Sequence, residues 1–126
     1  MNTIETLFVP YELAVKLKEL GFDEPCLAYH TRKKDIIPLQ QIRYEFNELK
    51  NSEINSTYCS SVAPTYQQAF RWFREKYDLI YVIVKAESWF FTINGCNTQE
   101  GFNTYEEAEL ACLTKLIEIV EQQKQK

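Results

Sequence analysis

Glycine and histidine are scarce in this 126-residue chain, and their scarcity excludes several kinds of site. The three glycines, Gly21, Gly95 and Gly101, lie far apart, so the chain has no glycine-rich loop of the kind that cradles phosphates. His30 is the only histidine, and the H-E-x-x-H and G-x-S-x-G motifs of metalloproteases and hydrolases are missing. We therefore expect no cofactor and no catalytic residue of these classes.

Basic residues and long hydrophobic runs are also in short supply. The chain has 14 Lys and Arg against 18 Asp and Glu, which gives a net charge of −4. Broad binding of nucleic acid needs many unopposed basic side chains to neutralise phosphates. The longest wholly apolar run, residues 79–84, is far too short to cross a bilayer, and no basic leader opens the sequence. We expect a cytoplasmic protein that binds neither membranes nor nucleic acid broadly.

Four cysteines are present, at positions 26, 59, 96 and 112, but no two have the C-x-x-C spacing of a zinc site or a redox motif. Because the chain has only one histidine, four closely placed zinc ligands are not available. Cys112 falls on the apolar arc of a predicted helix, where a thiol packs as a small hydrophobic group. These patterns predict reduced cysteines and no metal site.

The composition that remains is typical of one globular domain over residues 1–126, with 45% hydrophobic and 25% charged residues. Periodicity, caps and breakers predict three helices, at 10–20, 64–77 and 104–122. Alternating and β-branched runs predict four strands, at 25–31, 39–46, 79–84 and 89–93. The polar stretches 47–61 and 94–103 are expected to be loops. The order α-β-β-α-β-β-α predicts an α+β fold, with three helices packed on an antiparallel sheet.

Aromatic residues are concentrated on the predicted helix at 64–77. At about 100° per residue, four of them share one core-facing stripe: Tyr66, Phe70, Phe73 and Tyr77. Trp72 lies about 130° from that stripe. Tryptophan is common in binding hot spots, so Trp72 is either an anchor for a partner or a side chain that is covered within the chain.

The predicted last helix has more apolar surface than one packing contact needs. Its apolar residues span about 200° of arc, whereas a surface helix shows a stripe a little over about 100° wide. Leu110 and Ile117 lie on the edge of this arc. Either two sides of the helix are covered within the monomer, or another copy covers part of it. We expect Trp72 and the 110–117 edge to serve association, and the chain to form a homodimer.

Basic residues near aromatic ones support a second interpretation, a protein that binds and sequesters a small ligand or nucleotide. A base would stack on Trp72 or Tyr29, and arginines at positions 32, 71 and 74 would bind phosphate. The candidate binding residues for a partner or a ligand are Trp72, Arg71, Arg74, Lys76, His30, Arg32, Leu110 and Ile117.

A small enzyme is a third interpretation. Cys26 lies on the same predicted strand face as His30, but about 13 Å away if the strand is extended, so the two do not meet. We expect His30 to be a partly exposed histidine at a strand end. Glu106, Glu107 and Glu109 offset the positive start of the last helix. Glu109 projects near the apolar seam, which predicts a frayed first turn or a hydrogen-bonded partner.

Helix, hairpin and final helix in this order resemble the C-terminal half of double-stranded-RNA-binding domains. That family has lysines entering its last helix, whereas this chain has YEEAE at 105–109, and these acids repel phosphate. Three other segments together resemble a family of small uncharacterised proteins of gut anaerobes and of their phages and prophages: FVPYELAVKLKELGFDEPCLAYH (8–30), APTYQQAFRWFREKYDL (63–79) and YEEAELACLTKLIEIV (105–120).

The resemblance to the phage-associated family covers just under half the chain. It implies a phage or mobile-element setting, and it implies no activity, substrate or site residue. We therefore interpret the chain as a non-enzymatic interaction protein of such a setting, which acts through a protein partner or through self-association.

Overall fold

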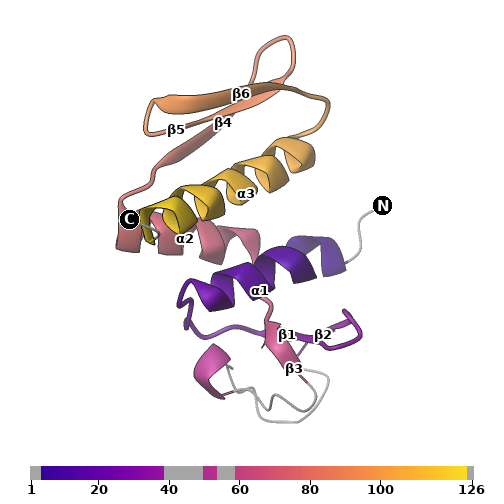
Figure 1. Ribbon diagram of the computed structural model, residues 1–126. Coiled ribbons are helices and arrows are strands. Elements are labelled where there is room, and N and C mark those ends of the chain that lie inside the picture. The colour runs from indigo at the N-terminus through magenta and orange to yellow at the C-terminus, as the bar shows by residue number, and fades with distance from the viewer. Residues whose placement is uncertain (1–3, 39–49, 54–58, 125–126) are drawn as a thin grey trace. The chain divides into compact units, whose positions relative to one another are not determined.

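The structure is a computed structural model, and it describes residues 4–38, 50–53 and 59–124 (Figure 1). Three α-helices alternate with two groups of three strands. The helices are α1 (Tyr11–Glu19), α2 (Tyr66–Tyr77) and α3 (Tyr105–Lys124). The strands are β1 (Ala28–Thr31), β2 (Ile36–Pro38), β3 (Cys59–Val62), β4 (Tyr81–Lys85), β5 (Trp89–Ile93) and β6 (Cys96–Phe102). Two short 3₁₀-helices are η1 (Ile4–Leu7) and η3 (Asn51–Glu53).

The predicted α+β class and the alternation of helices with strand groups are confirmed. Among the described residues, β2, β3 and β6 lie outside the predicted strands, and the strands form two antiparallel sheets. The predicted strand at 39–46 lies outside the described residues. The predicted loop at 47–61 lies partly outside them, and its last three residues belong to β3. The predicted loop at 94–103 is wrong where β6 runs.

The chain divides into two compact units, Met1–Ala69 and Phe70–Lys126. The boundary falls inside α2, and each unit is described below by itself. The expectation of a single domain stays a prediction.

Helix α1 of the first unit has both of its expected end signals. Pro10 is the N-cap residue, where its missing N–H leaves no helical hydrogen bond unmade. At the other end Gly21 has a φ of 99°, and its N–H donates to the Lys18 carbonyl at 3.0 Å. The Phe22 N–H donates to the Leu17 carbonyl at 2.9 Å, which completes a Schellman motif. Leu17 and Phe22 are both buried, as the apolar contact of this motif requires.

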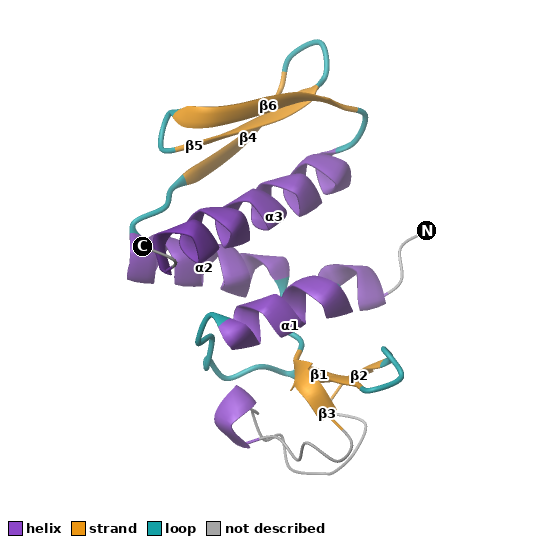
Figure 2. Ribbon diagram, in the orientation of Figure 1, coloured by secondary structure: helices purple, strands orange, loops and turns teal. Residues whose placement is uncertain are grey.

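The sheet of the first unit has the order β2-β1-β3, so β1 is its central strand (Figure 2). The predicted alternation holds, because Cys26, Ala28 and His30 are buried and Leu27 is exposed. The segment before α1 joins this sheet through Val9. The Val9 N–H donates to the Pro64 carbonyl at 2.8 Å, and the Val9 carbonyl lies 2.8 Å from His30 Nε2.

The second unit is a three-stranded sheet with the order β4-β5-β6, and α3 packs along one face of it (Figure 2). Phe91 and Ile93 of β5 are fully buried on that face. Helix α3 begins at the predicted cap, where the Glu107 N–H donates to Thr104 Oγ1 at 3.1 Å. The buried stripe of α3 consists of Ala108, Cys112, Leu113, Leu116, Ile117 and Val120. None of the described helices is long and apolar enough to cross a membrane.

A two-residue turn at Asn94-Gly95 connects β5 to β6. Both residues have positive φ, 53° and 73°, and Ile93 pairs with Cys96 across the turn. This geometry is the type I′ turn that Asn-Gly favours, because its twist matches that of the flanking strands. The Asn94 side chain also accepts a hydrogen bond from the Ile80 N–H at 2.8 Å, which fastens the turn to the segment before β4.

Candidate functional site

Trp72 is not an exposed anchor, contrary to one of the two interpretations above. Its side chain is 7% exposed, and its ring packs edge-on against Phe73 and Tyr77, with centroids 5.1 and 5.4 Å away. Lys76 Nζ lies 5.3 Å from the centroid of the Trp72 ring. Trp72 is therefore covered within the chain, and its ring is not offered for stacking on a base.

The basic residues of α2 lie on its exposed side. Arg71, Arg74 and Lys76 are exposed, and Arg71 Nε lies 3.5 Å from Glu75 Oε1 one turn further along the helix. Such exposed pairs contribute little to stability, about 0.5 kcal/mol or less. Because Trp72 is buried, these cations do not form a base-and-phosphate site with it. Arg32 is exposed in the turn after β1 and belongs to the other unit.

The predicted association edge of α3 divides into one buried and one exposed residue. Ile117 is 1% exposed and belongs to the core, so the expectation of a contact surface is wrong there. Leu110 is 40% exposed and lies in an open groove between α3 and β6 with a volume of about 430 Å³. The groove is lined by Gln99, Phe102, Glu107, Leu110, Ala111, Thr114 and Glu118. Its charged groups are carboxylates, so it does not suit a phosphate.

An apolar surface that sequence reasoning missed lies on β4. Ile80, Val82 and Val84 are 51%, 46% and 40% exposed. Alternate residues of a strand share one face, so these three side chains lie on the sheet face opposite α3. Cross-strand pairing continues this face into β5, with Thr92 opposite Val82 and Phe90 opposite Val84. We call the surface of Ile80, Val82, Val84 and Phe90 the outer face.

The signal for the outer face was present in the sequence. Residues 79–84 are apolar at odd and even positions alike, whereas a strand with one solvated face alternates. A strand that is apolar on both sides needs cover on both sides. α3 covers one side within the unit, and in the described part of the chain β4 pairs only with β5, so β4 is also an edge strand.

Titratable groups of the second unit cluster where α3 packs on the sheet, and burial is the main cause that raises the pKa of each: Tyr81, Tyr105, Glu109 and Cys112. The pKa of Cys112 rises to about 12, so its thiol stays protonated near neutral pH and is a poor nucleophile. Burial and the charge of Glu106 raise the pKa of Glu109, and a hydrogen bond with Tyr105 opposes that shift, which fits the second of the two alternatives for this carboxylate. No three His, Cys, Asp or Glu side chains gather as metal ligands within the described ranges.

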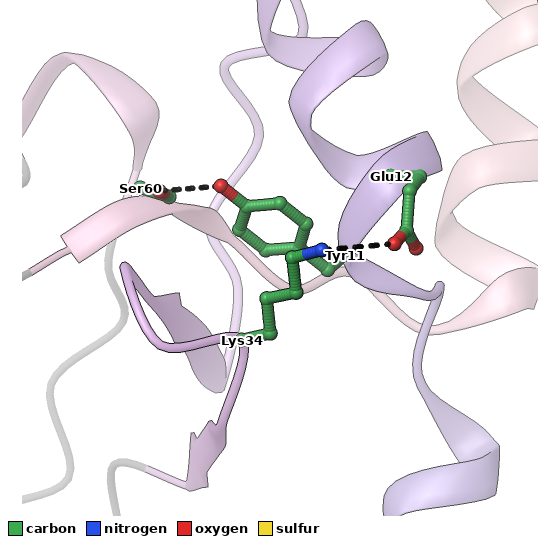
Figure 3. Close-up of polar contacts among 4 residues, drawn as sticks. All are labelled: Tyr11, Glu12, Lys34 and Ser60. Atoms are coloured by element: carbon green, nitrogen blue, oxygen red, sulfur yellow. Dashed lines mark hydrogen bonds and ion pairs between the residues drawn. The ribbon is translucent and has the colours of Figure 1, made fainter.

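Polar contacts in the first unit connect α1 to the sheet, as Figure 3 shows. The Tyr11 hydroxyl lies 3.2 Å from Ser60 Oγ of β3. Lys34, in the turn between β1 and β2, places its Nζ 3.7 Å from Glu12 Oε1 and 5.4 Å from the centroid of the Tyr11 ring. The turn between β1 and β2 thus contacts the start of α1.

A β-bulge explains why Ser60 reaches Tyr11. His30 pairs with Ser61 and Thr31 pairs with Cys59, so Ser60 is an extra residue in β3. Such a residue bends its strand and redirects its side chain. Lys18 Nζ also donates to the Ser60 carbonyl at 2.9 Å. The bulge therefore presents both a hydroxyl and a carbonyl of one residue to α1.

His30 is buried, and the expectation of a partly exposed strand-end histidine is wrong. It is 1% exposed because it lies on the covered face of the central strand, with the Tyr11 ring edge-on at 5.8 Å. Burial lowers the pKa of His30, and the Val9 carbonyl and the charge of Glu12 oppose that shift. Ser61, its cross-strand partner, is 0% exposed. A substrate cannot reach either side chain, so the pair is not a nucleophile and base.

No protein-family model, curated protein or solved structure matches the chain. Any proposal about function must therefore rest on the geometry of the chain itself: the outer face, the groove between α3 and β6, and the buried pair of His30 and Ser61.

Proposed function

We propose that the chain is a non-enzymatic interaction protein of the cytoplasm that works by binding a second copy of itself, in a phage or mobile-element setting. The observation that carries the proposal is the exposure of Val82 and Val84 on one face of the edge strand β4, together with Ile80 just before the strand. Soluble chains seldom leave contiguous apolar surface open without a use. Edge strands of this kind add a further strand unless charge or proline prevents it.

The sequence of β4 suits pairing with itself. In a two-fold antiparallel pair centred on Ile83, Val82 of one copy lies opposite Val84 of the other. Lys85 then lies opposite Tyr81, so no like charges face each other across the pair. The two sheets become one continuous sheet, and the two outer faces form one apolar surface.

Sedimentation velocity of wild-type protein and of Val82→Lys, at high micromolar concentration, tests the proposal. We expect a wild-type dimer and a folded monomeric variant. The lysine replaces the apolar contact with Val84 of the other copy, and it places the two introduced lysines diagonally across the pair on one face. Thr98→Lys is the matched control. It adds the same charge at an exposed position of β6, at the other edge of the sheet, and it should leave the dimer intact.

Far-UV circular dichroism of each variant shows whether it is folded. A wild-type protein that stays monomeric at high micromolar concentration overturns the proposal. So does a folded Val82→Lys protein that remains a dimer, because the contact then lies elsewhere. Equal dissociation by Thr98→Lys would point to the general effect of added charge rather than to β4.

A further inference from the structure

Two buried polar atoms in the first unit have no hydrogen-bond partner among the described residues. They are His30 Nδ1 and Ser61 Oγ. The two residues pair directly across β1 and β3, so their side chains lie on the same face of the sheet. Both residues are at most 1% exposed. Buried polar groups in native proteins are nearly always hydrogen-bonded, so this pair calls for a partner.

The tautomer of His30 follows from the Val9 contact. His30 Nε2 lies 2.8 Å from the Val9 carbonyl oxygen, and a carbonyl oxygen only accepts hydrogen bonds. Nε2 therefore carries the proton of the neutral ring. Nδ1 is left as a bare acceptor, and the cross-strand partner Ser61 carries a hydroxyl that can donate and accept.

We infer that His30 and Ser61 form a closed site for one water molecule, which donates to His30 Nδ1 and accepts from the Ser61 hydroxyl. A water suits these two atoms because it offers a donor and an acceptor at once. An anion does not, since Nδ1 presents a lone pair and no proton. A metal ion does not either, because no cluster of three potential ligands exists in the part of the chain that the structure describes.

The site has a structural consequence for the segment before α1. The water connects β3 to the His30 ring, and the ring connects β1 to the Val9 carbonyl. Val9 in turn donates to the Pro64 carbonyl just after β3, so both the N–H and the carbonyl of Val9 are held. The site is independent of β4 and of the proposed dimer.

Nuclear magnetic resonance tests the inference directly, because the chain has a single histidine and its two ring nitrogens give the only imidazole signals. At neutral pH we expect the ¹⁵N spectrum to show a protonated Nε2 and an unprotonated, hydrogen-bonded Nδ1. Cross-relaxation between His30 ring protons and water should reveal a long-lived bound water.

Two serine variants sharpen the test. Ser61→Ala removes one of the two partners of the water, so the cross-relaxation signal should be lost. Ser60→Ala is the control, since it removes the hydroxyl that contacts Tyr11 and should leave the signal in place. A proton on Nδ1, or a Ser61 hydroxyl that donates directly to Nδ1 with no bound water, overturns the inference. The wild-type spectra decide the question even if Ser61→Ala fails to fold.

Discussion

His30 should make the protein less stable in acid. Burial lowers its pKa in the folded chain, whereas the unfolded chain has the ordinary value of about 6.5. Below that pH the unfolded chain binds a proton that the folded chain does not, so the free energy of unfolding falls with falling pH. Above it both states are neutral and His30 adds no pH dependence. The groups around the ring are the Tyr11 ring, the Val9 carbonyl and Glu12, which is paired with Lys34 of the β1–β2 turn.

Urea unfolding of wild-type protein and of His30→Gln, between about pH 8 and about pH 5, measures this effect. The glutamine amide still donates toward Val9 but does not titrate. The stability difference between the two proteins should shift against wild type as the pH falls below about 6.5. Carboxylates also titrate in this range, and they cancel in the difference. A difference that does not change with pH would contradict the burial of a neutral His30.

Phe73 and Arg71 should differ sharply in their contributions to stability. Phe73 is 0% exposed, and Arg71 is exposed on the same helix. Phe73→Ala removes a buried ring and should cost about 3–5 kcal/mol, whereas Arg71→Ala should stay within about 0.5 kcal/mol. Denaturation midpoints of the two variants provide the comparison. Equal midpoints would mean that the helix phase of α2 is wrong.

The burial of a side chain was predictable from the sequence where a helix packs a single apolar stripe against a single core. Phe73 was placed correctly for this reason. His30 was expected to be partly exposed and Trp72 was left open between an anchor and a covered side chain, and both are buried. The periodicity gives the direction of a side chain, but it does not say how many sides of its element are covered. No signal in the sequence distinguishes a helix that is buried on one side from a helix that is buried on two.

At the scale of elements, the turn between β5 and β6 should depend on Gly95. Its φ of 73° lies in the left-handed region, and an added Cβ would meet no atom within 4 Å. The cost of Gly95→Ala is therefore conformational alone, about 1–2 kcal/mol. Gly95→Asn should cost less, because asparagine tolerates this region better. Chemical denaturation of both variants measures the order, and an equal or larger loss for asparagine would contradict the type I′ turn.

Helix ends were easier to predict than strands. Pro10, Gly21 and Thr104 are local signals, and each lies at an end of a helix whose predicted range it helped to set. β6 was missed although Asn94-Gly95 is a strong hairpin signal, because the strand that follows is polar and almost wholly exposed. Apart from its two end residues, β6 has no apolar side chains, so it shows no apolar alternation that would indicate a strand. Backbone hydrogen bonds pair β6 with β5, and these bonds do not depend on which side chains the strand has.

At the scale of the whole molecule, the division into two units had no signal in the sequence. The boundary lies inside a helix, so no linker of changed composition marks it. Two short sheets rather than one also follow from pairings between distant residues, such as Tyr29 with Val62. A pattern of helices and strands gives the fold class, and it leaves open which strands share a sheet. Whether β4 is an edge strand depends on which strands share a sheet. The sequence therefore shows the apolar run at 79–84, but it does not show that one side of this run is exposed.

The whole chain should not bind duplex RNA or DNA at physiological salt. Acidic residues outnumber basic ones in each of the two units, so neither unit is a basic module within an acidic chain. Helix α3 also begins with Glu106 and Glu107, which repel any phosphate that approaches its first turn. Affinity for phosphates depends on unopposed cations, and salt weakens it steeply. Fluorescence anisotropy with labelled duplexes of random sequence, at about 150 mM salt, measures the binding. Sub-micromolar affinity under these conditions would mean that the exposed cations of α2 or of the β1–β2 turn form a binding surface despite the net charge.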